Sequence, residues 1–300
     1  MTRSFPWKRA LGKKTIWISL LVILGLGLIA ALAPWIAPHD PYAGELTLTR
    51  LPPVWAQKSP TPAMASHILG TDRYGRDILS RLLYGTRTAF FLALTAVPLA
   101  ALIGTLTGLI AGYKSGWFDD LFMLFAEMLQ TLPGLMLLVI IVLIMRGLLT
   151  PTWLNGLLTL VVGFTVISWA SLARLVRVNV LLIRSQLFME AATALGSSPW
   201  QKILRHLLPN IRHVVIVWII NNIPLVILLE ALLGYIGVSV TSAVEGGEFT
   251  VVSWGGIFFT GRSALSSNPL MLIIPSICIL LLSMSFYLLG DFLNTATRPE

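Results

Sequence analysis

The 300-residue sequence is 56% hydrophobic and only 11% charged, and its mean hydropathy of +0.83 lies far above that of a soluble domain. These values exclude an ordinary soluble enzyme and predict a chain that crosses a membrane several times. The formal net charge of +8 does not indicate nucleic-acid binding, because the basic residues form no face with interleaved aromatic side chains. The single cysteine, Cys278, cannot form a disulfide within the chain.

The N-terminal segment carries five basic residues, and an apolar run follows from Thr15 to Ile36. This pattern and the small residues of Ala31-Leu32-Ala33 resemble a secretory signal peptide with its cleavage site. The run is nevertheless long enough to cross the bilayer, for which about 20 apolar residues suffice, and Pro34 disfavours cleavage at this point. We therefore expect residues 1–37 to form a cytoplasmic N-terminus and a retained first span.

Residues 38–86 have the composition of a loop, with prolines among polar spacers, and we expect this segment to be external. Charged and apolar residues alternate near its end, which predicts an amphipathic helix at the outer surface with ion pairs inside the segment. The residues in question are Asp72, Arg73, Arg76, Asp77, Ile78, Leu79, Arg81, Leu82 and Leu83.

Five further apolar runs predict spans at about 89–111, 121–145, 154–172, 214–236 and 269–290. With the first run they predict an all-α protein with six transmembrane helices, a membrane domain over 87–291 and a cytoplasmic tail over 292–300. Gly104, Gly108 and Gly112 recur on one helix face and predict close packing against a neighbouring helix. We expect Pro133-Gly134 to interrupt the third span, and Asn221-Asn222 with Pro224 to interrupt the fifth.

The distribution of Lys and Arg predicts the orientation. If the N-terminus is cytoplasmic, 13 of the 21 basic residues lie inside, and six of the other eight lie in or just after the long external loop. Charge in long loops contributes little to orientation. Because the number of spans is even, both termini are expected to be cytoplasmic.

The segment MEAATALGSSPWQKILRHLLPN, residues 189–210, is polar although spans lie on both sides of it. Good helix formers lead to Gly196, which stops a helix, and Ser198 and Pro199 suit the cap and first turn of a second helix that we expect to end at Pro209. The spacing predicts one apolar face on this second helix, made of Trp200, Ile203, Leu204, Leu207 and Leu208. Physical reasoning leaves two interpretations open, a helix lying on the inner leaflet and a helix that docks into a groove on a partner.

The spacing within this segment resembles a known motif. Glu190-Ala191-Ala192, three residues, Gly196, nine residues and then His206-Leu207-Leu208-Pro209 resemble the EAA loop of binding-protein-dependent ABC importer permeases. His206 stands where the general pattern has isoleucine, which is similar to the peptide-type branch of that family.

Four other stretches resemble dipeptide and oligopeptide permeases, and specifically the second (C-type) of their two permease subunits. They are LGTDRYGRDILSRLLYGTRTAF (69–90), LLEALLGYIGVSV (228–240), SWGGIFFTGR (253–262) and LLGDFLNTA (288–296). The segment SVTSAVEGGEFTVVSWGG (239–256) departs from this branch, because a proline-rich link is expected before the SWG element.

The resemblance implies the transmembrane domain of a type I ABC importer in the bacterial cytoplasmic (inner) membrane. It implies three kinds of partner: a second permease, one or two ABC ATPase subunits and an extracytoplasmic substrate-binding protein. The residues that it implies for ATPase coupling, within a loop over 186–210, are Glu190, Ala191, Ala192, Gly196, Ser198, Pro199, Trp200, His206, Leu208 and Pro209. Since the sequence has no phosphate-binding loop of the type G-x-x-x-x-G-K-[ST], we expect no enzyme activity and no cofactor here, with ATP and Mg²⁺ on the ATPase partners.

Polar residues inside the expected spans are candidates for a pathway or gate, with hydrogen bonding between helices as the alternative. They are Glu127, Gln130, Asn221, Asn222 and Glu230, and we favour a structural or gating role for Glu230, which falls about 25 Å along its helix and so near the outer interface.

The histidines give no indication of a resident metal. His39, His67, His206 and His213 lack metal-ligand spacing and are divided between the two sides, so we expect no metal site, although transport of a chelated metal stays open. The alternative function is an ion-gradient-driven secondary transporter, for which we find no convincing internal repeat.

Overall fold

The computed structural model describes residues 14–56, 65–148, 153–238, 251–266 and 268–297, and all the secondary-structure elements in these ranges are helices. Five helical segments there are long and apolar enough to cross a membrane. They are α2 (Lys14–Ile36), α4 (Ile78–Lys114), α7 (Trp153–Arg184), the run that ends in α10 (Leu208–Ile236), and α12 (Leu270–Thr297). The pair α5 (Trp117–Thr131) and α6 (Gly134–Leu148) is a sixth candidate, bent by 96° at its break. The all-α expectation is confirmed, with six spans if this pair crosses as one.

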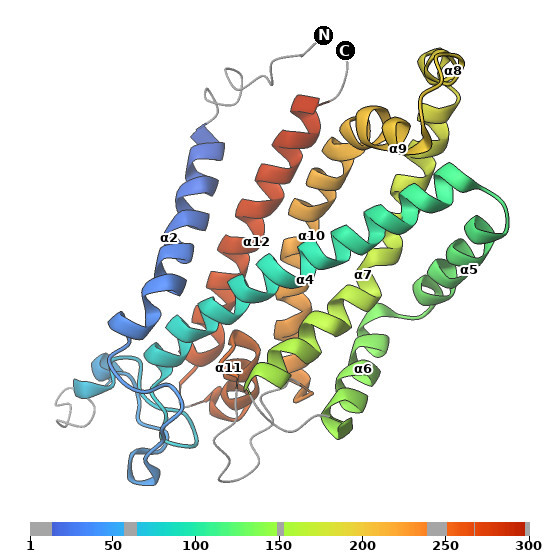
Figure 1. Ribbon diagram of the computed structural model, residues 1–300. Coiled ribbons are helices and arrows are strands. Elements are labelled where there is room, and N and C mark those ends of the chain that lie inside the picture. The colour runs from blue at the N-terminus through green and yellow to red at the C-terminus, as the bar shows by residue number, and fades with distance from the viewer. Residues whose placement is uncertain (1–13, 57–64, 149–152, 239–250, 267, 298–300) are drawn as a thin grey trace.

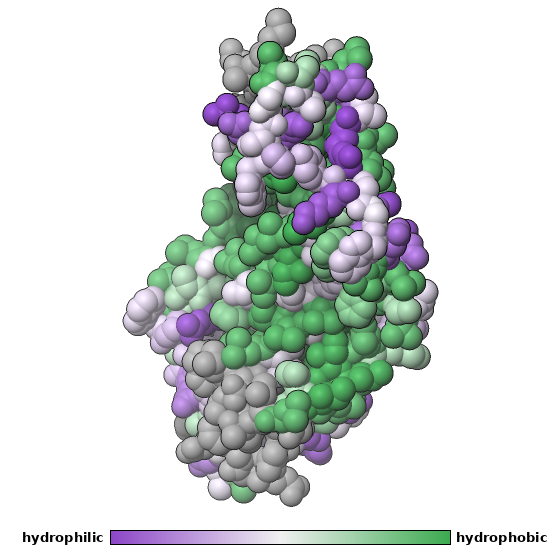
Figure 2. Space-filling view, turned by 45° about the vertical axis from the view of Figure 1, so that its right-hand side comes forward, coloured by the Kyte–Doolittle hydropathy of each residue, from purple (hydrophilic) through white to green (hydrophobic). Residues whose placement is uncertain are grey.

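The helices form a bundle in which α2, α12 and α10 run side by side while α4 crosses them and packs along α7 (Figure 1). One end carries the start of α2, the end of α12, α8 (Leu187–Ala194) and α9 (Pro199–Lys202). The opposite end carries the short helix α11 (Trp254–Gly261). An apolar surface covers much of the middle of the molecule, and hydrophilic side chains gather toward the end with α8 and α9 (Figure 2).

Two helices extend well beyond the apolar runs that predicted them. The run at 89–111 lies inside α4, and the run at 154–172 lies inside the longer helix α7. Hydropathy marks only the part of a helix that suits hydrocarbon, whereas a helix continues until a stop signal ends its hydrogen-bond ladder. For α4 that stop is Ser115-Gly116, where both residues have positive φ.

The glycines predicted to mediate close packing lie where α4 crosses α7. A Cβ added to Gly104 would lie 2.6 Å from the Trp169 carbonyl oxygen, and one added to Gly108 would lie 2.5 Å from that of Ala173. At Gly112 the nearest atom would be Val180 Cβ, at 2.9 Å. The backbones of the two helices therefore approach so closely that only glycine fits, which confirms the prediction.

Proline acts differently at the two interruptions that the sequence predicts. Leu132, the residue before Pro133, is extended with φ −81° and ψ 139°, and the helix breaks there as predicted. The predicted interruption of the fifth span is wrong, because α10 runs unbroken through Asn221, Asn222 and Pro224. One proline removes a single backbone hydrogen bond, and the turns packed on either side of Pro224 keep the helix together.

The predicted amphipathic helix before the second span is only partly right, because residues 78–83 are helical but form the first turns of α4 and not a separate helix. Residues 70–77 form a tight turn that leads directly into α4. The Asp72 carboxylate accepts hydrogen bonds from the backbone N–H groups of Tyr74 (2.8 Å) and Arg76 (3.1 Å), a pattern that favours a turn over a helix. The predicted ion pairs within the segment are present, since Arg76 Nη2 lies 2.8 Å from Asp72 Oδ2.

Substituting Gly108 by alanine should destabilise the bundle by about 1–3 kcal/mol, because the added methyl group overlaps the α7 backbone. The matched control is Gly25→Ala in α2, where an added Cβ meets nothing within 4 Å. That change should be neutral or stabilising because alanine is the better helix former. Thermal unfolding of the purified protein in detergent measures both, and equal unfolding temperatures for the two variants would contradict the packing argument.

Candidate functional site: the segment between α7 and α10

The α8–α9 segment, residues 186–210, joins the ends of α7 and α10, and Gly196 shapes its turn. Gly196 has φ +75° and donates its N–H to the Thr193 carbonyl, while Ser197 donates to that of Ala192, both at 3.0 Å. This pair of bonds closes the end of α8 and needs a left-handed residue. A Cβ on Gly196 would meet nothing within 4 Å, so the position requires a backbone conformation rather than space.

The second helix begins with a capping box. Ser198 Oγ accepts a hydrogen bond from the Gln201 N–H at 3.3 Å, and Gln201 Oε1 accepts one from the Ser198 N–H at 2.8 Å. Pro199 occupies the first helical position, where its missing N–H costs nothing. The predicted cap and first turn are confirmed, and the reciprocal bond made by Gln201 is a feature that was not predicted.

The second helix does not end at Pro209, contrary to the prediction. It passes through a π-helical turn (Ile203–Leu207) into α10, with Pro209 in the first turn of α10. A proline lacks the N–H and its ring clashes with the carbonyl four residues earlier. The π turn widens the helix here, and the Leu208 N–H bonds instead to Ile203, five residues back.

The predicted single apolar face is split in two. Leu207 is fully buried and Ile203 half-buried against the bundle, whereas Trp200 is 70% exposed. The π turn changes the angular spacing after Ile203, so the predicted face cannot stay on one side. Leu195, which caps the C-terminus of α8, is likewise 86% exposed. The segment therefore rests on the bundle with one set of apolar side chains and exposes another.

The remaining residues of the motif join α8 to the second helix or face outward. Lys202 Nζ donates to Thr193 Oγ1 at 2.9 Å, and the His206 ring lies 6.0 Å from that of Phe188 between centroids. Ala192 lies on the buried face of α8. The outward-facing motif residues are Glu190, Ala191, Ser198, Pro199, Leu208 and Pro209.

Three arginines of α7, the helix that leads into this segment, bond to α4 and α5, although the sequence indicated them only as topology signals. Arg177 forms a bidentate ion pair with the buried carboxylate of Asp119 on α5, donating from Nε and Nη2. Arg184 Nη1 donates to the Gly112 carbonyl at 2.8 Å, and Arg174 Nη1 donates to Gln130 Oε1 at 2.8 Å. Arg174, Arg177 and Arg184 fall on one helical face, which is the signal that could have revealed a shared role.

The candidate pathway residues do not gather at one place. Glu127 is exposed on α5, where Gln130 accepts the bond from Arg174. Asn222 Nδ2 donates to the Trp218 carbonyl of its own helix at 2.8 Å. Asn221 is exposed and its side chain lies next to Gly290 of α12. A Cβ added to Gly290 would lie only 2.3 Å from Asn221 Oδ1.

Glu230 has a different environment from the other four. Only 4% of this residue is exposed, and it faces the start of α11, where a Cβ on Gly255 would lie 2.9 Å from Glu230 Oε1. The backbones of α10 and α11 cross closely here, at Gly234 and Gly255. Whether Glu230 has a structural or a gating role stays a prediction.

Comparison with known proteins identifies the family. Residues 104–299 match the family described as the binding-protein-dependent transport system inner membrane component, and residues 3–53 match the N-terminal TM domain of oligopeptide transport permease C. The dipeptide permease DppC of Bacillus subtilis (strain 168) is 32% identical over 98% of this chain and 84% of its own length. The glutathione permease GsiD of Pectobacterium atrosepticum is 32% identical over 98% of this chain and 90% of its own.

A more distant likeness adds nothing to this match. The solved inward-facing methionine ABC transporter MetNI aligns with a TM-score of 0.46 and 17% identity, over 74% of this chain and 94% of that chain. The relatives in the sequence comparison are ABC importer permeases and give no support to the alternative of an ion-gradient-driven secondary transporter. The chain belongs to the family of binding-protein-dependent transport system inner membrane components, the permease subunits of ABC importers.

Proposed function

We propose that this chain forms the translocation pathway of a peptide-type importer together with a second permease subunit. We further propose that its α8–α9 segment couples conformational changes of the ATPase partners to the transmembrane helices. The relatives named for dipeptide and glutathione transport support a solute of this class. ATP and Mg²⁺ would be bound by one or two ABC ATPase subunits, and an extracytoplasmic binding protein would deliver the solute. The bundle end with α8 and α9, and with it both termini, would face the bacterial cytoplasm, in agreement with the distribution of basic residues.

The observation that carries the proposal is the exposed apolar set on the α8–α9 segment. Leu187, Leu195 and Trp200 are between 70% and 86% exposed, although the same segment buries Met189 and Leu207 against the bundle. Apolar side chains exposed on an otherwise polar element indicate a docking surface. Together with the EAA-type spacing, this favours a groove on an ATPase subunit over the lipid surface.

The mechanics follow from how the segment is attached. Its second helix is continuous with α10 through the π turn, and α8 follows directly on α7, whose arginines hold α4 and α5. A displacement imposed on the segment by closing ATPases would therefore move α7 and α10 as rigid elements. Such movement would switch the access of the pathway from one side of the membrane to the other.

A groove between α10 and α12 is the face that we assign to the second permease. It has a volume of about 790 Å³ and is lined by Leu228, Leu232, Phe258, Leu280 and Tyr287 among others. An exposed apolar groove of this size is typical of a surface that another subunit covers in the assembled complex.

Replacing Gly196 by valine should uncouple ATP hydrolysis from transport, whereas Gly196→Asn should retain most coupling. A side chain at φ +75° costs about 1–2 kcal/mol for ordinary residues, and asparagine tolerates this conformation best. We expect solute uptake by proteoliposomes containing the whole complex to fall by roughly 5- to 30-fold in the valine variant, with ATPase activity no longer stimulated by loaded binding protein. Equal uptake by both variants would show that the left-handed turn is not needed.

Replacing Leu195 by aspartate should weaken ATPase docking by about tenfold or more without changing the thermal stability of the permease, because this side chain contacts little of its own chain. Leu46→Asp is the matched control, since Leu46 is 79% exposed but lies in the segment between α2 and α4. The affinity of purified ATPase subunits for the permease pair in nanodiscs measures the effect. If both variants bind the ATPase subunits with wild-type affinity, Leu195 is not part of the docking surface. That result would favour the interpretation in which the segment lies on the membrane surface.

A further inference from the structure

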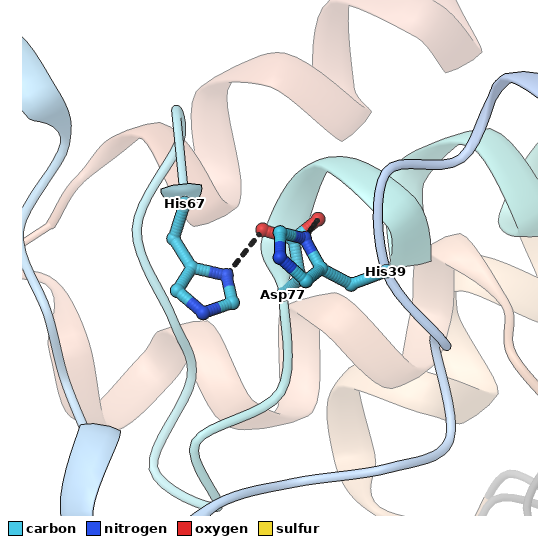
Figure 3. A group of neighbouring side chains, drawn as sticks. All are labelled: His39, His67 and Asp77. Carbon is cyan, nitrogen blue, oxygen red and sulfur yellow. Dashed lines mark hydrogen bonds and ion pairs between the residues drawn. The ribbon is translucent and has the colours of Figure 1, made fainter. Parts of the chain in front are cut away.

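His39, His67 and Asp77 come together where the segment after α2 meets the start of α4 (Figure 3). The start of α4 lies at the bundle end opposite α8 and α9 (Figure 1). His39 follows α2, His67 lies in the stretch before α4, and Asp77 caps the N-terminus of α4. His67 Nδ1 lies 2.9 Å from Asp77 Oδ1, and His39 Nδ1 lies 3.9 Å from Asp77 Oδ2. One potential ligand atom from each residue lies within 4.8 Å of the others.

The cluster is well enclosed. The Asp77 side chain is fully buried and that of His67 is 8% exposed, while that of His39 is 34% exposed. The two imidazole rings stack with centroids 4.3 Å apart. The His39 backbone N–H donates to Ser80 Oγ at 3.0 Å, so the loop after α2 is held where its imidazole faces the carboxylate.

Apart from the two histidines, Asp77 has no basic partner among the described residues. Arg76 and Arg81 pair with Asp72, and within the described ranges no lysine or arginine pairs with Asp77. Asp77 Oδ2 accepts bonds from the Ser80 N–H and hydroxyl, both at 2.7 Å. His39 Nδ1 is buried and has no hydrogen-bond partner among the described residues. A cation between the rings and the carboxylate would satisfy this nitrogen and compensate the buried charge.

We propose that His39, His67 and Asp77 bind one divalent transition-metal ion of the zinc type. Two imidazoles and a carboxylate suit such ions, whereas Mg²⁺ and Ca²⁺ prefer oxygen ligands. Tetrahedral zinc places neighbouring ligand atoms about 3.3 Å apart. The observed separations, from 2.9 Å to at most 4.8 Å, bracket this value and require only side-chain adjustment.

The ion clamps the segment after α2 onto the start of α4. Coordination through the His67 Nδ1 lone pair replaces the contact of this atom with Asp77, and the single proton of the neutral imidazole is then carried by Nε2. Three protein ligands leave a fourth position for water or for a donor from another protein. Motif spacing gives no hint of the site because zinc motifs usually pair ligands only a few residues apart, while here the fold joins separate segments.

The test uses the assembled complex, purified with a tag that contains no histidine and freed of metal by a chelator. Titration with Co²⁺ alone should give the visible d–d absorption of a low-symmetry site, with one ion per copy of this chain, and Zn²⁺ should displace it. Zn²⁺ should also raise the unfolding temperature of the wild-type chain.

The decisive variants are His39→Gln and His67→Gln, each of which should lower Co²⁺ affinity by at least about tenfold. Asp77 is not substituted because it caps α4. His213→Gln, which removes an exposed histidine from α10, is the matched control and should bind like the wild type. His39→Gln should fold, since its bond to Ser80 uses the backbone.

Two results would overturn the proposal. One is a wild-type complex that takes up no more Co²⁺ than His39→Gln, and the other is undiminished binding by both variants. If His67→Gln folds poorly, the spectrum of His39→Gln alone decides, because a lost imidazole ligand must change the d–d bands.

Discussion

The crossing of α4 and α7 sets the positions of both ends of the molecule. Lipid provides no hydrophobic force between helices, so their association depends on close contact of small residues. Gly104 and Gly108 let the two backbones meet, and the arginines of α7 then bond to α4 and α5 beyond the apolar stretch. The end of α7 carries the α8–α9 segment, and the start of α4 carries the turn with Asp72 and Asp77.

The α8–α9 segment combines one sharp turn with one continuous connection. Gly196 lets the chain reverse after α8, because only a left-handed residue completes the pair of bonds that closes that helix. The π turn before Pro209 does the opposite, since it carries the helix past a residue that would otherwise end it. The result is a short element that stands away from the bundle on one side and is rigidly joined to α10 on the other.

Buried polar groups lie mainly where helices begin or end. Asp72 and Asp77 use backbone donors at the start of α4, and Glu230 faces the N-terminus of α11. At these places the chain has free N–H groups that the hydrocarbon region cannot satisfy. The His39, His67 and Asp77 cluster follows the same logic, because it forms where two loops close over a helix cap.

The sequence by itself determined the features that depend on neighbouring residues: the apolar runs, the glycine stripe, the turn at Gly196 and the cap at Ser198. It also contained the motif spacing that indicated the family. Only the tertiary structure decided that α10 continues through Pro224, because burial of Ile223, Val226 and Ile227 on either side holds the helix together there, whereas the chain breaks before Pro133. The Asp119–Arg177 pair and the histidine cluster were likewise decided by packing, since their partners lie on separate segments and no local pattern encodes the distance between them.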